Sequence, residues 1–415
     1  MPLSHYTIPM HARTWLSVLS LPLVAAFTLP VVQQGNPPKP AATAAKAVPQ
    51  DPLAGLSDIQ DVLSLVQQNY VDPPNMEKVL AGGIQAVLER SHPLNAYLSA
   101  EDLRLPDPGP ASVGLTVLKR GIYASVLAVT PGGPAAKAGI QPGDVLRKMD
   151  GDSVGQLSAW ALERRLRGPV GSSLDLYRYN ATGDLTKTTV VRALPGHADL
   201  TLKPGTEALL VALPDLLPGR AEELKKALAT ADRGQTLVLD LRLCERGAMD
   251  EAALVAGLLG AKGSFATVQE AGKPDRALPV VVGGAPFARL ALLVGRSTLG
   301  APEVLAACLK KGGARTFGER TPGLGVERSR FLLKQGGAVE LVSRRWLGLG
   351  GEKLDRQGVT PEQVLRLAEA DDALAKVLAA LATPPPPPKV EAPEKAPEGS
   401  PLLPPHVIAP KKPNP

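Results

Sequence analysis

Residues 124–151 read ASVLAVTPGGPAAKAGIQPGDVLRKMDG, and this stretch determines the fold of the region around it. An apolar strand comes first, followed by a Pro/Gly turn, one helical turn rich in alanine, a second turn and a strand that ends in Asp-Gly. Gly139 and Gly143 permit the positive φ angles that such short turns need. The pattern predicts one domain over residues 110–195.

This pattern resembles the core of bacterial PDZ domains, which bind an extended peptide by adding it to the edge of a sheet. The resemblance implies that backbone N–H groups of a tight loop hold the terminal carboxylate, and that a helix at residues 158–167 offers an apolar pocket. The expected peptide-binding residues are Ser112, Val113, Gly114, Leu115, Thr116, Leu162 and Leu166. Ser112 replaces a glycine that is usual in the family, and its N–H group remains available. The alternative is a PDZ fold that only packs on its neighbour.

The flanking regions predict a multidomain chain that combines α+β and α/β parts. Residues 53–109 carry apolar residues at three- and four-residue spacing, which predicts an N-terminal helical region. Residues 206–368 alternate strands with helices, and the strands are almost continuously apolar. Such strands are typical of a mostly parallel α/β core with both faces covered.

Two stretches of that α/β core resemble the catalytic stretches of the carboxyl-terminal processing (tail-specific) proteases, which are PDZ-containing serine peptidases. Residues 292–303 read LLVGRSTLGAPE, and residues 318–325 read GERTPGLG. The LVLDLR segment at residues 237–242 and the GVTPE segment at residues 358–362 extend the resemblance, which covers roughly residues 53–368.

The resemblance implies a Ser–Lys dyad, and this chain lacks it. The position of the nucleophile is Gly300, the position of the base is Leu324, and the position of the orienting glutamine is Arg328. Arg246 replaces the first glycine of the pair that forms the oxyanion hole, and only Gly247 is kept. Loss of the nucleophile alone lowers the rate of a serine peptidase by a factor on the order of 10⁶. We therefore expect a pseudoprotease.

Three other side chains invite a catalytic interpretation. Ser297 and Thr298 lie just before Gly300, so a shifted register would make one of them an alternative nucleophile. Residues of this type are also common in turns and helix caps. His92 has no acid or serine in a suitable context, so a structural role in its loop is the better interpretation.

The two ends of the chain differ from its centre. Residues 1–32 have a basic start followed by an uncharged stretch at residues 15–32, which resembles a secretory signal or a signal anchor. Residues 33–52 form a Pro/Ala-rich linker, and residues 384–415 begin with five prolines and form an extended tail, either a spacer or a docking segment. We expect an exported protein of the periplasm or cell envelope, and the alternative to a cleaved signal is an anchor in the inner membrane.

The composition and the residue spacing argue against several classes of function. The net charge of +6 on 415 residues comes without a basic stripe interleaved with aromatic residues, which argues against nucleic-acid binding. The five histidines are scattered, which argues against a metal site, and no phosphate-binding glycine loop is present, so we expect no cofactor. Cys244 and Cys308 lie in apolar contexts and are read as free buried thiols, although one bridge between them stays open.

The sequence therefore predicts an exported homologue of tail-specific proteases that binds C-terminal or unstructured segments of envelope proteins. Such a protein would act as an adaptor, or as a regulator of an active protease. Two alternatives stay open: an active, divergent serine endopeptidase that uses Ser297 or Thr298, and a purely structural envelope protein.

Overall fold

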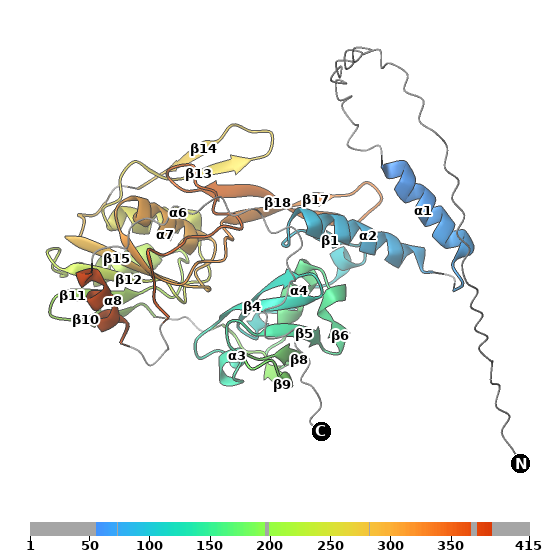
Figure 1. Cartoon of the computed structure of the whole chain (residues 1–415), viewed down its shortest axis with the longest axis horizontal. Coiled ribbons are helices and arrows are strands. Elements are labelled where there is room, and N and C mark those ends of the chain that lie inside the picture. The colour runs from blue at the N-terminus through green and yellow to red at the C-terminus, as the bar shows by residue number, and fades with distance from the viewer. Residues whose placement is uncertain (1–54, 73, 196–198, 282, 367–371, 384–415) are drawn as a thin grey trace, which may run out of the picture. The chain divides into compact units, whose positions relative to one another are not determined.

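The computed structural model describes residues 55–72, 74–195, 199–281, 283–366 and 372–383 (Figure 1). The predicted leader at residues 1–32, the linker at residues 33–52 and the tail at residues 384–415 lie outside the described residues. Within the described part of the chain, every helix is too short or too polar to cross a membrane. The chain divides into two compact units, residues 1–71 and residues 72–415.

The described part of the first unit is helix α1 (Leu56–Asn69). Its apolar residues recur at the predicted helical spacing, yet none of its side chains is buried. Leu56, Ile59 and Val62 are each more than half exposed.

The second unit begins with helix α2 (Met76–Ser91), whose first turn is capped by the Asn75 side chain accepting a hydrogen bond from the Lys78 N–H group. The short strand β1 (Ala96–Leu98) and the 3₁₀ turn η1 (Asp102–Arg104) follow. The sequence predicted the helix, whereas it offered only a loop at β1. This strand forms because it pairs with a distant strand, β18 (Ala338–Leu347).

The predicted PDZ domain is present as an antiparallel sheet with the strand order β3-β4-β5-β8-β9. Gly139 and Gly143 have φ angles of +74° and +98°, as the turn pattern requires. The strands are β2 (Ala111–Ser112), β3 (Leu115–Arg120), β4 (Tyr123–Val129), β5 (Val145–Met149), β6 (Asp152–Ser153), β7 (Arg167–Gly168), β8 (Ser173–Tyr179) and β9 (Leu185–Val191). The helices are α3 (Pro134–Lys137), η2 (Val154–Gln156) and α4 (Ala159–Leu166).

The α/β core contains the predicted parallel sheet, in the order β10-β11-β12-β15-β16-β19, with β10 as its antiparallel edge strand. Its strands are β10 (Thr201–Pro204), β11 (Ala208–Ala212), β12 (Thr236–Asp240), β15 (Arg289–Val294), β16 (Arg315–Gly318) and β19 (Gln363–Val364). Its helices are α5 (Arg220–Ala227), α6 (Met249–Leu258), α7 (Ala301–Lys311) and α8 (Ala373–Ala382).

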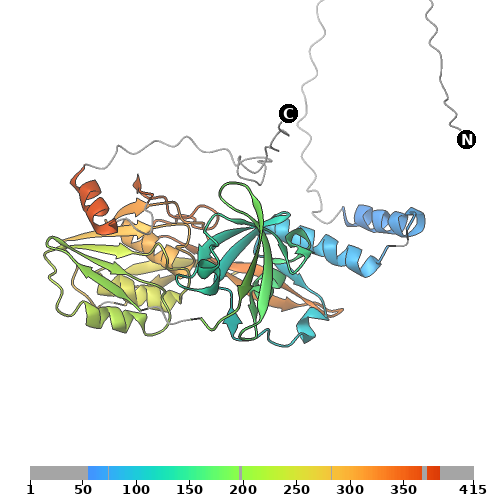
Figure 2. The ribbon, with the colours of Figure 1, turned by 90° about the horizontal axis from the view of Figure 1, so that it is seen from below.

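Both faces of this parallel sheet are covered. Helices α5, α6 and α7 pack with one face, and helix α8 packs with the other face through Ala373, Val377 and Ala380. Figure 2 shows α8, in red, on the opposite side of the sheet from α5 and α6. The coverage explains why the central strands β11, β12 and β15 are largely apolar.

A second, antiparallel sheet was not predicted. It has the order β1-β18-β13-β14, with β17 also paired to β18. Its further strands are β13 (Ser264–Glu270), β14 (Arg276–Pro279) and β17 (Val326–Leu332). Strand β17 starts one residue after Gly325, so this sheet is attached directly to the loop that carries Leu324.

Candidate functional site

The candidate site is built around the sharp turn between strand β15 and helix α7. Gly300 occupies the tip of that turn with φ +63° and ψ −122°, just before the first residue of the helix. Its carbonyl accepts hydrogen bonds from the N–H groups of Glu303 and Val304, which start the helix. Turns of this shape present the residue at their tip, and glycine adopts the required backbone angles without strain.

Leu324 lies next to Gly300, so the structure brings together the two positions where the resemblance places a nucleophile and a base. A Cβ atom added to Gly300 would lie 4.0 Å from the Leu324 carbonyl oxygen, with no other heavy atom within that distance beyond the chain neighbours. Leu324 is half-buried. Neither residue carries a side-chain group that transfers a proton.

Glu303 holds the two segments together, and sequence reasoning gave it no role. Its carboxylate accepts a short hydrogen bond from the Thr321 hydroxyl and bonds of 2.7 Å from each of the N–H groups of Gly323 and Leu324. Burial raises the pKa of Glu303 to about 7, and the hydrogen bonds from Thr321, Gly323 and Leu324 oppose this rise. The residue therefore fixes the Leu324 loop against the start of α7.

The hydroxyls of the alternative nucleophiles are used in the structure of the turn. Thr298 is fully buried; its Oγ1 donates to the Leu241 carbonyl at 2.8 Å and accepts from the Gly295 N–H at 2.9 Å. The Ser297 Oγ donates to the Leu127 carbonyl of the PDZ domain at 3.0 Å. Each hydroxyl proton is directed at a backbone carbonyl, which cannot remove it.

Close packing against Leu216 explains why position 247 is a glycine. A Cβ atom at this position would lie 2.4 Å from the Leu216 Cβ, closer than packed atoms can approach. The neighbouring residues pair with the same leucine: the Leu216 N–H donates to the Arg246 carbonyl, and the Ala248 N–H donates to the Leu216 carbonyl, both at 2.9 Å. The loop also meets the turn at Gly300, because the Leu299 N–H donates to the Cys244 carbonyl.

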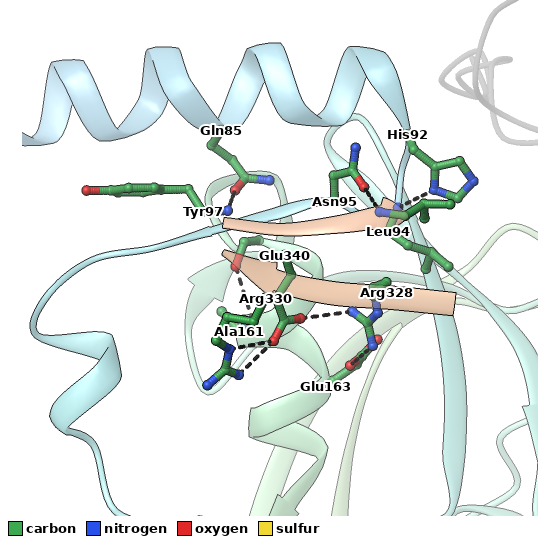
Figure 3. A network of polar contacts seen from close by, with 12 residues as sticks. Gln85, His92, Leu94, Asn95, Tyr97, Ala161, Glu163, Arg328, Arg330 and Glu340 are labelled. Carbon is green, nitrogen blue, oxygen red and sulfur yellow. Dashed lines mark hydrogen bonds and ion pairs between the residues drawn. The ribbon is translucent and has the colours of Figure 1, made fainter. Parts of the chain in front are cut away.

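Arg328, at the position of the orienting glutamine, takes part in an ion-pair network. Its guanidinium lies 2.8 Å from the Glu163 carboxylate of helix α4 and 3.5 Å from the Glu340 carboxylate of β18 (Figure 3). Burial disfavours its charge, but the charges of Glu163 and Glu340 outweigh this and raise its pKa. Arg330 also pairs with Glu340, at 2.7 Å.

The predicted carboxylate loop of the PDZ domain uses its own N–H groups internally. The Ser112 N–H donates to the Ala193 carbonyl at 2.9 Å, and the Val113 N–H donates to the Leu166 carbonyl at 3.1 Å. The Gly114 N–H donates to the Ser112 hydroxyl at 2.9 Å.

The side chains of the predicted peptide-binding residues fall into two groups, one in a cleft and one in the core. Ser112, Gly114, Leu115 and Thr116 line one cleft of about 840 Å³, together with the segment from Thr130 to Pro134, strand β9 and Glu245. Val113, Leu162 and Leu166 instead belong to the hydrophobic core of the PDZ domain, where they are 0%, 1% and 5% exposed, so their side chains do not line the cleft. The resemblance to PDZ domains implied that Leu162 and Leu166 line an apolar pocket for the ligand, and this prediction is wrong because both side chains face the core.

Glu245 is a second acidic residue that sequence reasoning passed over. It lies in the loop after β12, and its carboxylate enters the PDZ cleft. It accepts hydrogen bonds from the Thr116 hydroxyl at 2.8 Å and from the Thr130 hydroxyl at 3.0 Å. Both threonines belong to the PDZ domain.

His92 occupies the structural role expected of it. Its Nδ1 accepts a hydrogen bond from the Leu94 N–H, and its Nε2 lies 3.1 Å from the Asp355 carboxylate. The hydrogen bond from His92 lowers the pKa of Asp355. Cys244 and Cys308 are free and buried, and burial raises the pKa of both thiols, that of Cys308 to about 11. Across the described residues, no three His, Cys, Asp or Glu side chains gather to hold a metal ion.

Comparisons with protein families agree with this architecture. The family model of peptidase family S41 matches residues 208–365, and that of the PDZ domain matches residues 125–176. The first range contains the turn at Gly300 and the loop at Leu324.

Individual relatives give the same result. The chain is 24% identical over 321 residues to a probable CtpA-like serine protease of Staphylococcus aureus strain MRSA252, a match that covers 74% of this chain and 64% of the relative. A probable CtpA-like serine protease of Staphylococcus saprophyticus is 21% identical over 319 residues, covering 74% and 65%. The chain thus spans about 64% of the length of such curated relatives.

Among solved structures, the photosystem II D1 C-terminal processing protease has a similar fold. The superposition gives a TM-score of 0.63 at 22% sequence identity and covers 80% of this chain and 98% of that protein.

Proposed function

Because this chain belongs to the PDZ-containing family of carboxyl-terminal processing proteases, we propose that it binds C-terminal or unstructured protein segments without cleaving them. The supporting observation is the pair Gly300 and Leu324. The turn and the loop of a peptidase site lie side by side, held by Glu303, and neither carries a reactive side chain.

The chemistry of acyl transfer supports this proposal. A serine peptidase forms a covalent acyl-enzyme, which needs a nucleophile and a group that takes its proton. Gly300 and Leu324 supply neither, and the nearby Ser297 and Thr298 hydroxyls donate to backbone carbonyls. The loss of these groups lowers the rate by a factor on the order of 10⁶.

A digestion experiment tests the absence of cleavage. The full chain is incubated with unstructured peptides that bear free C-termini, and fragments are identified by mass spectrometry. The matched comparison is the double variant Gly300→Ser, Leu324→Lys. We expect no fragments from the natural chain. Fragments that disappear in a Ser297→Ala or a Thr298→Val variant would identify a divergent serine peptidase instead.

A binding experiment tests the second half of the proposal. Gly114 has a φ angle of +74°, and an added Cβ atom would lie 3.2 Å from the Thr130 Cβ. We therefore expect Gly114→Asp to abolish peptide binding by distorting the loop and adding a negative charge. Unchanged binding would exclude the PDZ loop as the peptide site.

We further propose that the protein acts in the cell envelope, as an adaptor for envelope proteins or as a regulator of an active protease. The basic start and the uncharged stretch at residues 15–32 support export. Fractionation of cells that produce the full chain, with Edman sequencing of the isolated protein, tests this proposal. Recovery from the cytosol with an intact first residue would contradict it.

A further inference from the structure

We propose that the cleft of the PDZ domain binds a ligand carboxylate at the hydroxyls of Thr116 and Thr130, where the Glu245 side chain now lies. This inference rests on the proposed function and specifies its binding site. It places the carboxylate at side-chain hydroxyls, whereas the resemblance to PDZ domains implied backbone N–H groups.

The N–H groups of Ser112, Val113 and Gly114 in the loop are already paired. The Val113 N–H donates to the Leu166 carbonyl, and the Gly114 N–H donates to the Ser112 hydroxyl. A carboxylate bound there would have to break contacts that join the loop to helix α4 and close the turn.

A carboxylate of the protein itself already occupies the hydroxyl site. Glu245 accepts one hydrogen bond at each of its two oxygens, 2.8 Å from Thr116 and 3.0 Å from Thr130. The site is next to the loop, because an added Cβ atom at Gly114 would lie 3.3 Å from the Thr130 hydroxyl oxygen. The two threonines therefore form a preformed, two-pronged site for a carboxylate.

The position of Glu245 in the fold allows its side chain to leave the site. It is half-buried, and it lies in the irregular loop between β12 and α6, outside any strand or helix. An incoming carboxylate makes the same two hydrogen bonds that Glu245 gives up, and the Glu245 side chain then hydrates in solvent. The exchange keeps the number of charged hydrogen bonds constant.

The surroundings of the site indicate the kind of ligand. Lys137 and Arg246 line the same cleft and favour a negatively charged group. Leu115, Val191 and Leu194 add apolar surface, which suits the side chain beside a terminal carboxylate. A volume of about 840 Å³ accommodates a short peptide segment. The ligand is thus a peptide carboxylate, from either a C-terminus or an acidic side chain.

The test measures binding of fluorescent peptides to the full chain by anisotropy. One peptide has a free C-terminus, a second is the same peptide with an amidated C-terminus, and a third is amidated and carries an internal glutamate. Glu245→Ala removes the internal competitor, and we expect it to tighten binding at least about tenfold. The variant with both Thr116→Val and Thr130→Val should weaken binding by a similar factor.

Two control variants separate these effects from general changes. Glu319→Ala removes an acidic residue that pairs with Arg296 outside the cleft, and Thr201→Val removes an exposed hydroxyl from β10. Neither should change the affinity. The preference among the three peptides identifies the source of the carboxylate.

The outcomes distinguish this site from the proposed function. Peptide binding that is insensitive to Glu245→Ala and to loss of the two hydroxyls overturns the hydroxyl site and leaves the binding function intact. The absence of binding to the natural chain and to Glu245→Ala overturns both. If the double threonine variant fails to fold, the Glu245→Ala result decides alone.

Discussion

At the scale of single residues, the backbone at Gly300 limits what evolution or design can place there. The φ angle of +63° strains any L-residue, yet the space around the Cβ position is open. We expect Gly300→Ala to lower the free energy of unfolding by about 1–2 kcal/mol, measured by urea denaturation. The control is Gly82→Ala in α2, where no atom lies within 4 Å and alanine should stabilise the helix. Equal effects at both positions would contradict the strain argument.

A second residue-scale prediction concerns the protonation of Glu303. Its pKa is about 7 in the fold against an ordinary value of 4.5, so the folded chain holds a proton that the unfolded chain releases between these pH values. This protonation contributes roughly 3 kcal/mol to the free energy of unfolding. The contribution is fully present below pH 4.5 and is lost as the pH rises through 7.

Glu303→Gln cannot titrate, so it isolates this contribution. The difference in unfolding free energy between the natural chain and the variant should fall as the pH rises from about 5 to about 8. Chemical denaturation across this range measures it, and Glu319→Gln controls for the removal of an acid from the same segment. A difference that stays constant with pH would show that Glu303 keeps its ordinary pKa.

At the scale of elements, Arg328 joins strand β17 to helix α4 of the PDZ domain (Figure 3). Its side chain is 26% exposed and that of Glu163 is 45% exposed, so solvent weakens the pair. A double-mutant cycle with Arg328→Ala and Glu163→Ala should give a coupling of about 1 kcal/mol that decreases with salt. The surface pair Lys225 and Glu222 is the control and should give almost none. Equal coupling in both pairs would contradict the argument.

Some helices, strands and turns could be predicted from the sequence, and others could not. The turns of the PDZ domain were predictable because glycine and proline act locally. The parallel core was predictable because its central strands are largely apolar. Strand β1 was not, since its existence depends on pairing with β18 far along the chain. The resemblance to PDZ domains placed Leu162 and Leu166 in a ligand pocket, whereas tertiary packing covers both side chains with the core of the domain.

Some parts of the candidate site could likewise be predicted from the sequence, and other parts could not. The positions of Gly300 and Leu324 followed from short motifs, and the structure brings them together. Glu303 ends the LLVGRSTLGAPE stretch and Glu245 lies outside the quoted motifs, and neither received a role because a single acidic residue is usually a solvated surface group. Their roles arise only when distant hydroxyl and N–H donors converge on them in the fold.

At the scale of the whole molecule, polar contacts join the PDZ domain to the elements around Gly300 and Leu324. The Ser297 hydroxyl donates to Leu127, Glu245 accepts from two PDZ threonines, and Arg328 pairs with Glu163. Outside the PDZ domain, the contacting residues lie in the turn before Gly300, in the loop after β12 and in strand β17. The PDZ domain and the α/β core therefore stabilise each other. We therefore expect the full chain to unfold in one cooperative transition in scanning calorimetry.

Breaking two of these contacts should separate the two parts. In the variant Ser297→Ala, Arg328→Ala, each domain keeps its own hydrophobic core, because neither side chain belongs to one. The contacts that remain include those of Glu245, and the expected result is a broadened or double transition with the less stable part unfolding first. The matched control, Lys225→Ala with Thr201→Val, alters exposed groups within the α/β core and should keep the single transition. Two transitions in the natural chain would show that the domains unfold independently.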